Sequence, residues 1–422
     1  MANFQKLIDN KAESAQYMMD EIAHICKNLP KRAPGEEGEK LACEYMAEVL
    51  KKDGGCERAD VESFKEHPYS FLGWIYFTIT FALAGIVLFF FLPALGAVLI
   101  GIGFAIMIAQ FGLYRKAIDF VFPEKTGHNV TAIKKCTGEV KARIFFNGHP
   151  DAAWNWPVNN KFGGKVYEAH IGSSVIGALI ALALCIAAAV ATEGQVMDVF
   201  TLEAYELFYG EALFWAGIVQ LVFVPGLILM YFMWDPKTTV DGANDNLTGC
   251  YMGIAILKAM KDAGIELEHT EVGVILSGSE EAGLRGAKAW VEAHKGEFDD
   301  VPTWIYSYDT IHDGKFLGVN YRDLNATVKA DKEVSDMFMN CAKELGIKCN
   351  KTLVPPLGGA TDSAAFAQGG YKVTGITALN HVLEDYYHTM KDTYTNLDKN
   401  CLADCYAISV KCLEKFDQQF GK

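Results

Sequence analysis

"TEVGVILSGSEEAGLRGAKAWVEAHKG", Thr270 to Gly296, joins a predicted strand to a predicted helix through a glycine-containing turn. The apolar run that ends at Leu276 is typical of a buried strand, and the segment from Ala282 is typical of an amphipathic helix that ends at a glycine. A strand followed directly by a helix is the repeating unit of α/β folds. Glu280 and Glu281 lie in the turn, where open α/β sheets bind their ligands.

Two adjacent glutamates do not by themselves indicate a functional site. Acidic side chains in the first turn of a helix interact favourably with the helix dipole, and this explains most isolated pairs. The function of Glu280 and Glu281 therefore depends on which other motifs the chain contains.

The same alternation of strands and helices recurs along the chain. Strands are predicted at 58–65, 128–135, 142–148, 270–278 and 302–309, and helices at 36–52, 247–264, 282–296 and 335–346. Alternating elements of this kind form a mostly parallel, mixed sheet with helices on both faces. We therefore predict the α/β class.

Two long apolar regions interrupt this pattern. Residues 71–113 contain no charged side chain and are divided by Pro93 and Gly96, and residues 171–192 and 212–234 are also uncharged. Each of the four pieces has about 20 residues, enough for a helix to cross ~30 Å of hydrocarbon. Because they contain no ionisable group, we interpret the four pieces as membrane anchors rather than as a transport pathway.

The predicted organisation is one polar domain interrupted by two transmembrane hairpins. The hairpins are 69–114 and 171–234, and the polar domain consists of 1–68, 115–170 and 235–422. Four crossings are an even number, so all three polar pieces are expected on one side of the membrane and can contribute to one site.

The distribution of charged residues around the spans predicts on which side of the membrane the polar domain lies. The connection between the third and fourth spans contains Glu193, Asp198, Glu203, Glu206 and Glu211 but no Lys or Arg, whereas the other flanks contain Lys65, Arg115, Lys116, Lys161, Lys165 and Lys237. The N-terminal sequence has no signal-peptide pattern. By the positive-inside rule the polar domain is predicted to be cytoplasmic.

Composition argues against two further classes. The net charge of −14, without a basic stripe, excludes nucleic acid as a partner. Eleven cysteines without a CxxC motif do not indicate a disulfide framework, in agreement with a reducing compartment. The sequence gives no indication of the oligomeric state.

Several further segments contain potential metal ligands at strand ends or in turns. "FFNGHPDAAW" contains His149 and Asp151, "DGANDNLTG" contains Asp245, the strand "PTWIYSYD" ends with Asp309, and "EDYYHTMKDT" contains His388. An imidazole can bind a metal while a nearby carboxylate orients the ring. Each residue alone also has an ordinary structural explanation, such as a helix cap or a satisfied loop side chain.

Taken in order, these segments resemble metallopeptidase family 28, the double-zinc exopeptidases, which include bacterial aminopeptidases and glutamate carboxypeptidase and have glutaminyl cyclase as a relative. The resemblance covers nearly all of the polar residues, from "LPKRAPGEEGEKLACEYMAEVLKKDGG" through "NGHPDA", "GANDNLTG", "GSEEAGLRGA", "YSYDT" and "GGATDSAAF" to "YYHTMKDTYTN". It implies the zinc exopeptidase fold.

The resemblance also implies a role for each candidate residue. Asp245 would bridge two metal ions, His149 and Asp309 would complete one site, and Glu281 and His388 the other. The metals would be two Zn²⁺, with Co²⁺ or Mn²⁺ as substitutes.

The remaining implied roles concern catalysis and the surroundings of the metals. Glu280 would be the catalytic base, because a carboxylate that binds metal cannot also take the proton from the attacking water. Tyr387 would stabilise the oxyanion, and Asp151 would support a ligand. The peptide bond between Asp245 and Asn246 is expected to be cis.

Other histidines receive a structural interpretation. His388 is preferred over His381 as a ligand because "YHTMKDT" matches the closing motif of the family. The remaining candidates are predicted to be ordinary polar residues without partners: His24, His269, His294 and His312.

The predicted function is that of a membrane-anchored zinc exopeptidase, most simply an aminopeptidase, that acts on peptides. Three alternatives remain open: an N-acyl amino acid amidohydrolase, a glutaminyl cyclase-like transferase, and a non-catalytic membrane receptor or scaffold. The second hairpin separates the His149 and Asp245 motifs and is expected to hold the site close to the bilayer. This predicts that the substrate is delivered at the membrane surface.

Overall fold

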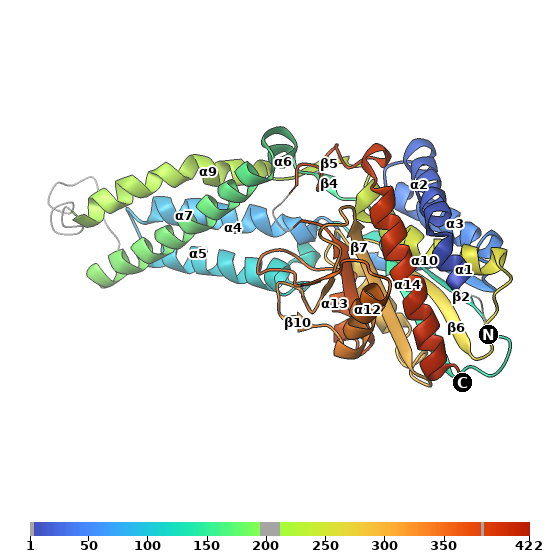
Figure 1. Ribbon diagram of the computed structural model, residues 1–422. Helices are drawn as coiled ribbons and strands as arrows, with labels where there is room; N and C mark the ends of the chain where they lie inside the picture. Colours follow the sequence, from blue (N-terminus) through green and yellow to red (C-terminus); the bar gives the residue numbers. More distant parts are fainter. Residues whose placement is uncertain (1–3, 195–211, 381–383) are drawn as a thin grey trace. The chain divides into compact units, whose positions relative to one another are not determined.

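The computed structural model describes residues 4–194, 212–380 and 384–422, and these form two compact units. The first, here called the sheet unit, consists of Met1–Pro68, Pro123–Asn155 and Lys237–Lys422. The second, here called the helical unit, consists of Tyr69–Phe122 and Trp156–Pro236. Figure 1 shows the elements of both units along the chain.

An eight-stranded sheet forms the centre of the sheet unit, with the strand order β1-β2-β6-β3-β7-β12-β8-β11. The strands β6, β3, β7 and β12 are parallel to one another. β2 pairs antiparallel with both β1 and β6, β8 pairs antiparallel with β12, and β11 is parallel to β8. This mixed sheet confirms the predicted fold class. The strands are β1 (Arg58–Glu66), β2 (Lys125–Lys134), β3 (Ala142–Gly148), β6 (Thr270–Ser277), β7 (Thr303–Ile311), β8 (Gly318–Asn320), β11 (Asn350–Thr352) and β12 (Lys372–Ala378).

Helices cover both faces of this sheet. The helices α3, α10, α12 and α14 pack on one face, with α1 and α2 against them, and α11 and α13 pack on the other. Side chains alternate accordingly, since Phe146 belongs to the core under α10 while Phe145 packs edge-on against Trp290 of α11. The helices are α1 (Phe4–Asp9), α2 (Lys11–Asn28), α3 (Glu37–Lys52), α10 (Thr248–Asp262), α11 (Arg285–Ala293), α12 (Lys332–Glu344), α13 (Asp362–Gln368) and α14 (Lys399–Phe420).

Short elements connect these helices and strands. They are β4 (Trp154–Asn155), β5 (Asp235–Thr239), η5 (Ala243–Leu247), β9 (Arg322–Asp323), β10 (Val328–Lys329) and η6 (Tyr394–Asn396). Among them, η5 is the turn that leads into α10.

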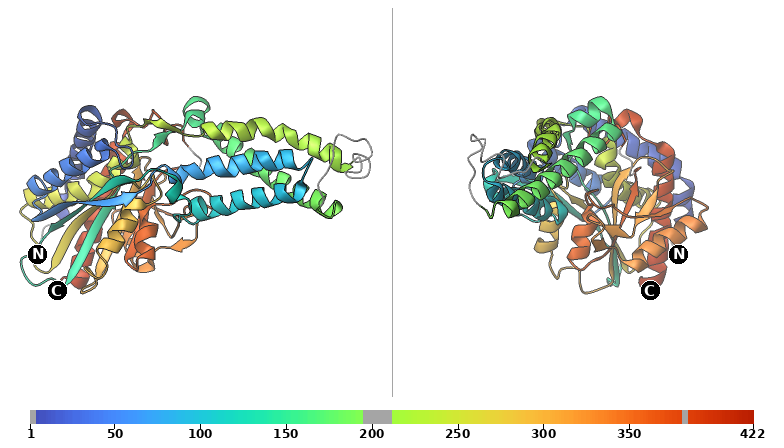
Figure 2. Two further views of the ribbon diagram at one scale, coloured as in Figure 1. Left: turned by 180° about the vertical axis from the view of Figure 1, so that it is seen from behind. Right: turned by 90° about the vertical axis from the view of Figure 1, so that its left-hand side faces the viewer.

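The helical unit contains four helices that are long and apolar enough to cross a membrane: Ser70–Leu88, Pro93–Gly112, Gly164–Ala191 and Ala212–Phe232. Figure 2 shows α4, α5 and α7 of this unit side by side. Aliphatic side chains such as Val190 and Val219 are exposed on its surface. The elements are α4 (Ser70–Leu88), α5 (Pro93–Met107), η1 (Ile108–Gly112), η2 (Asp119–Val121), α6 (Pro157–Phe162), α7 (Gly164–Ala191), η3 (Gln220–Phe223), α9 (Val224–Leu229) and η4 (Met230–Phe232).

Two stretches that we assigned to the polar domain, 115–122 and 156–170, fall in the helical unit. The physical reason is that α7 already begins at Gly164, so the polar residues Lys165 and Glu168 form its first turns. Of the acidic residues between the third and fourth spans, Asp198, Glu203, Glu206 and Glu211 lie outside the described residues, as does His381.

Close packing of small residues joins the helices of this unit. The hydroxyl of Thr78 on α4 donates a 2.8 Å hydrogen bond to the carbonyl of Gly103 on α5. A Cβ at Gly96 of α5 would lie 3.0 Å from the sulfur of Cys185 on α7. Such contacts let helix backbones approach one another where both helices are apolar.

A complete polar network lies at the end of the first hairpin. The Gln110 amide donates to Ser70 Oγ and to Asp119 Oδ1, both at 3.1 Å, and Ser70 donates to Asp119 at 2.7 Å. The Gln110 carbonyl accepts the backbone N–H groups of Ala117 and Ile118. These bonds fix the turn that leaves η1.

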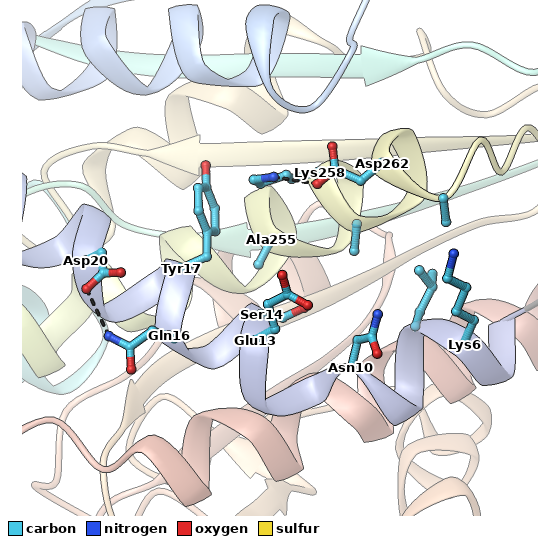
Figure 3. A pocket seen from close by; sticks show the side chains of 13 residues that line it. Lys6, Asn10, Glu13, Ser14, Gln16, Tyr17, Asp20, Ala255, Lys258 and Asp262 are labelled. Carbon is cyan, nitrogen blue, oxygen red and sulfur yellow. Dashed lines mark hydrogen bonds and ion pairs between the residues drawn. The ribbon is translucent and has the colours of Figure 1, made fainter.

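The sheet unit also has an open surface groove of about 470 Å³ between α1, α2 and α10. Figure 3 shows its mixed lining, in which Gln16 contacts Asp20 and Lys258 contacts Asp262. None of the residues predicted to bind metal or to act in catalysis lines this groove.

Candidate active site

The predicted site residues meet at the carboxyl edge of the parallel strands. His149 directly follows β3, Glu280 and Glu281 follow β6, and Asp309 lies near the end of β7. These three strands are neighbours in the sheet, so their carboxyl ends lie side by side. Asp245 in η5 and His388 in the loop after β12 complete the set.

The ligand-type atoms form two groups that share Asp245. The first group consists of His149, Asp245 and Asp309, and the second consists of Asp245, Glu281 and His388. Within each group the ligand-type atoms lie within 4.8 Å of one another. Oδ1 of Asp245 lies 3.3 Å from Nε2 of His149, and Oδ2 lies 3.1 Å from Nε2 of His388. The two oxygens of one carboxylate therefore face different groups.

The arrangement of these atoms fits metal ions better than hydrogen bonds. Nε2 of His388 also lies 3.1 Å from Oε1 of Glu281. Nevertheless, neither this oxygen nor Oδ2 of Asp245 accepts a hydrogen bond of acceptable geometry from any described residue. Ring nitrogens and carboxylate oxygens that converge without aligned donors are the expected geometry of a His/Asp/Glu metal site, the donor set that zinc prefers.

The charge of the site gives a second test of whether these residues suit metal ions. Asp245, Glu280 and Glu281 are buried and Asp309 is half-buried. Among the described residues, none of the four forms an ion pair with Lys or Arg. Because buried charges need compensation, a cluster of this kind is suited to divalent cations.

The pKa values reflect the same crowding of negative charge. Burial, and then the neighbouring Asp245, raise the pKa of Asp309 to about 8. Burial also raises the pKa of Glu280 well above its usual range. Asp245 behaves differently, because its contacts with the two histidines outweigh burial and hold its pKa below the usual range.

Asp151 supports both the His149 ring and the glutamate loop. Its Oδ1 lies 3.3 Å from Nδ1 of His149 and accepts the backbone N–H of Glu280 at 3.1 Å. Its Oδ2 accepts the backbone N–H of Glu281 at 3.0 Å. A carboxylate in this position behind an imidazole can fix the orientation of the ring.

Asp392 and Asn244 hold the turn that carries Asp245, a role that we did not predict from the sequence. Oδ1 of Asp392 accepts both the backbone and side-chain N–H groups of Asn244 at 2.8 Å, and Oδ2 accepts the Asp245 N–H at 3.1 Å. The peptide bond between Asp245 and Asn246 is cis, as expected from the family resemblance. The sequence offered one signal for the role of Asp392, namely that it lies in the same motif as His388.

Four histidines were predicted to lack partners, and this is wrong for each of them. Away from the site, His24 contacts Asn28, His269 contacts the carbonyl of Glu139, and His294 contacts Glu62. In the site, His312 also has a partner. Its Nδ1 lies 2.9 Å from Oδ1 of Asn244, and its ring lies 4.3 Å from that of Tyr386. His312 therefore adds a further contact to the turn that carries Asp245.

Arg32 joins two loops of the site, a role that we did not predict from the sequence. Its guanidinium is buried and donates to the carbonyls of Pro150 at 2.6 Å, Asp241 at 2.7 Å and Gly242 at 2.9 Å. Pro150 follows His149, and Gly242 precedes η5. The only signal was the position of Arg32 in the quoted segment "LPKRAPG".

Tyr387 and Asp362 also lie near the candidate ligands. The ring of Tyr387 stacks on that of His388 with centroids 4.0 Å apart. The buried Asp362 accepts a 2.5 Å hydrogen bond from the hydroxyl of Ser277, the last residue of β6.

Comparisons with known proteins identify a similar family and a similar fold. The model of Peptidase family M28 matches residues 229–413, which contain every candidate ligand except His149. This part of the chain, less than half of its length, is therefore similar to peptidase family M28. A search of the curated proteins finds no match.

Solved structures of several enzymes share the fold. A zinc aminopeptidase from Bacillus subtilis is 13% identical, with a TM-score of 0.55 and 95% of each chain covered. LapB from Legionella pneumophila is 11% identical, with a TM-score of 0.54, and the match covers 98% of this chain and 76% of LapB. A glutaminyl cyclase from an Acidobacteriales bacterium is 13% identical, with a TM-score of 0.52, covering 97% of this chain and 95% of the cyclase.

Proposed function

We propose that the protein is a zinc-dependent exopeptidase, specifically an aminopeptidase. The observation that carries the proposal is the geometry of Asp245, whose two oxygens face two separate groups of ligand-type atoms. His149 and Asp309 would hold one zinc ion with Asp245, and Glu281 and His388 would hold the other. The similarity in fold to a zinc aminopeptidase supports this assignment.

In the proposed mechanism, bound zinc would polarise the scissile carbonyl group and lower the pKa of a water molecule. Glu280 then takes a proton from the attacking water and gives it to the leaving amine. Glu280 suits this role because its Oε2 lies 3.9 Å from Nε2 of His149, close to the candidate ligands without belonging to either group. Tyr387, beside His388, would donate to the oxyanion.

The charge of the site supports an aminopeptidase over a carboxypeptidase. Two divalent ions would balance the charges of Asp245, Glu280, Glu281 and Asp309. Among the described residues no Lys or Arg pairs with these carboxylates, and the additional carboxylate of Asp151 lies behind His149. This environment favours a cationic α-amino group over a substrate carboxylate.

We further propose that the helical unit anchors the enzyme in a membrane, with the sheet unit in the cytoplasm, and that substrates are taken at the membrane surface. The four apolar helices and the bias of Lys and Arg in their flanks support this placement. Retention in the membrane fraction after alkaline extraction tests the anchoring, and protease accessibility in oriented vesicles tests the side. Release by alkaline extraction would contradict the anchoring.

A panel of substrates tests the chemistry. Detergent-purified wild type is compared with Glu280→Gln and with the exposed control Glu266→Gln, using aminoacyl, N-acyl amino acid and C-terminally unprotected peptides. We expect about two zinc ions in all three proteins, with release of N-terminal amino acids lost only in Glu280→Gln. Cleavage of the N-acyl substrates alone would replace the proposal with an amidohydrolase, and full activity of Glu280→Gln would refute the assigned base.

The glutaminyl cyclases among the structural neighbours provide a second comparison. Completeness of both ligand groups favours the peptidase, because the cyclase relative uses one zinc ion. A peptide with an N-terminal glutamine distinguishes the two, since a cyclase releases ammonia and a peptidase releases free glutamine. We expect no ammonia.

A further inference from the structure

Ser279, immediately before Glu280, is held by two buried glutamates from distant parts of the chain. Its hydroxyl lies 2.7 Å from Oε1 of Glu39 on α3 and 2.6 Å from Oε1 of Glu66 at the end of β1. All three side chains are buried. The φ angle of Ser279 is +55°, in the left-handed region that a serine rarely adopts, so the contacts hold an uncommon backbone conformation.

A serine hydroxyl has one proton and can donate it to only one of the two glutamates. The other carboxyl group must then approach Ser279 Oγ as a donor, because two oxygens without a proton between them repel at 2.6–2.7 Å. Glu39 and Glu66 therefore share one proton. Burial, and then the charges of Asp151 and Glu66, raise the pKa of Glu39, in agreement with this sharing.

Glycines make room for the two carboxyl groups. A Cβ at Gly35 or at Gly127 would lie 2.9 Å from Oε1 of Glu66, and a Cβ at Gly278 would lie 2.4 Å from Oε1 of Glu39. Glu39 Oε2 also accepts the backbone N–H of Gly35 at 2.9 Å. The two glutamates are thus confined between backbone segments and cannot follow Ser279 if its loop moves.

The loop of Glu280 is held from a second side by Asp151, which accepts the backbone N–H groups of Glu280 and Glu281. The hydroxyl contacts act on the residue before Glu280, and the Asp151 contacts act on Glu280 itself and the residue after it. The backbone on both sides of Glu280 is therefore fixed.

We propose that Ser279, clamped by Glu39 and Glu66, is a positioning residue that sets the place of Glu280 for proton transfer. The inference rests on the proposed function, in which Glu280 is the base. Ser279 does not bind metal or touch the substrate in this arrangement. It acts through the backbone of its neighbour.

The first test compares Ser279→Ala with wild type on a leucyl p-nitroanilide substrate. We expect kcat to fall by about 10- to 100-fold with KM within about twofold, because a displaced base affects the transition state more than substrate binding. Bound zinc is expected to stay at the wild-type level. An unchanged kcat, or a loss of kcat that only follows loss of zinc, would overturn the proposal.

Ser335→Ala is the matched control, because Ser335 is another fully buried serine whose hydroxyl contacts Asp331 and Thr374 away from the site. Its loss is expected to lower thermal stability by a similar amount and to leave kcat unchanged. An equal fall in kcat in Ser335→Ala would show a merely structural effect.

Glu66→Gln tests the shared proton. A glutamine amide can donate to Ser279 Oγ while Ser279 donates to Glu39, so the single variant is expected to keep kcat within about threefold. The double variant Glu39→Met with Glu66→Met removes both polar partners of the hydroxyl and is expected to match Ser279→Ala. A loss of kcat in Glu66→Gln equal to that in the double Met variant would refute the sharing.

Amide hydrogen exchange can be measured in a protein that hydrolyses no peptide. It therefore tests whether Ser279 holds the loop of Glu280 independently of whether the proposed function is correct. The amides of Glu280 and Glu281 are expected to exchange at least about tenfold faster in Ser279→Ala than in wild type or Ser335→Ala. Unchanged exchange would overturn the clamp even in an active enzyme. Faster exchange in a protein that hydrolyses no peptide would retain the clamp and reject the function.

Discussion

The candidate active site and the polar end of the first apolar hairpin both bury carboxylates, but they satisfy them in opposite ways. Asp119 accepts hydrogen bonds from Ser70 and Gln110, so that network is complete within the protein. Asp245 and Glu281 each have a buried oxygen that accepts no well-aligned hydrogen bond from a described residue. Buried carboxylates whose hydrogen bonds are incomplete therefore mark the candidate functional site, whereas buried carboxylates whose hydrogen bonds are complete have a structural role.

The largest effect is expected when the carboxylate at the centre of each region is neutralised. Asp245→Asn removes the carboxylate shared by both ligand groups, so we expect loss of both zinc ions and a fall in kcat of at least about 10³-fold. Metal analysis and peptide hydrolysis measure the two effects. Asp119→Asn is the control and is expected to retain zinc and activity while it lowers thermal stability. Zinc retained at two per chain in Asp245→Asn would contradict the bridging role.

Removal of metal from the wild type tests the same difference between the two regions without a mutation. Ligands that bind only the folded state stabilise it, so chelation is expected to lower the Tm of the wild type by about 5–10 °C. Readdition of zinc should restore both the Tm and activity. Asp245→Asn is expected to show no chelator effect, and a Tm that is equally insensitive in the wild type would argue against a metal in the folded protein.

Arg32 allows a test of the loops that carry the ligands. Arg32→Lys keeps the positive charge but loses the planar guanidinium that reaches three carbonyls, Pro150, Asp241 and Gly242. We expect zinc affinity to fall by about 10- to 100-fold, measured by competition with a chromophoric chelator. Arg143→Lys is the control, since Arg143 pairs with Glu271 and Asp300 elsewhere in the sheet unit. Equal affinities in both variants would show that Arg32 does not position the ligands.

A substitution in the hydrogen-bond network around Gln110 in the first hairpin is expected to have a smaller effect, on stability and not on metal binding. Gln110→Ala leaves the N–H groups of Ala117 and Ile118 without their side-chain acceptor, and one buried donor or acceptor without its partner costs about 1–3 kcal/mol. Thermal unfolding in detergent measures the loss. Peptidase activity per bound zinc is expected to stay unchanged. Reduced activity per zinc would show that the network around Gln110 has more than a structural role.

Local motifs explain why much of the site could be predicted from the sequence. His149, Glu281 and Asp309 each follow or end a strand that the apolar pattern identifies, and β3, β6 and β7 prove to be parallel neighbours. The assignment of these residues to two metal groups came from the family resemblance and not from the pattern. The structure brings all five candidate ligands together in those groups.

The rest of the site depends on pairs that no local pattern indicates. Ser279 meets Glu39 and Glu66 across 240 and 213 residues, and Glu39 and Glu66 look like ordinary helix and strand residues in the sequence. The strands β8 to β12 and the helix α14 were also absent from the prediction. Strands of two or three residues, such as β8, are too short to show an alternating pattern.

His294 shows the same limit and provides the last and smallest prediction. We predicted that it lacks partners, but its Nε2 lies 2.8 Å from Oε2 of Glu62, 232 residues away, and its Nδ1 contacts Glu297. Burial lowers the pKa of His294, but the two carboxylates outweigh burial and raise it above the ordinary value. A group whose pKa is higher in the folded state stabilises the fold while it is protonated in both states.

The stabilisation by His294 is therefore fully present below the unfolded pKa of about 6.5 and is lost as the pH rises through the folded pKa. We expect His294→Gln to cost about 1 kcal/mol near pH 5.5 and clearly less near pH 9, measured by chemical denaturation at each pH. His24→Gln, on the exposed side of α2, is the control for the loss of a histidine side chain and is expected to change the free energy of unfolding little. If the loss of unfolding free energy in His294→Gln instead grew with pH, His294 would be buried in its neutral form. It would then not form ion pairs with Glu62 and Glu297.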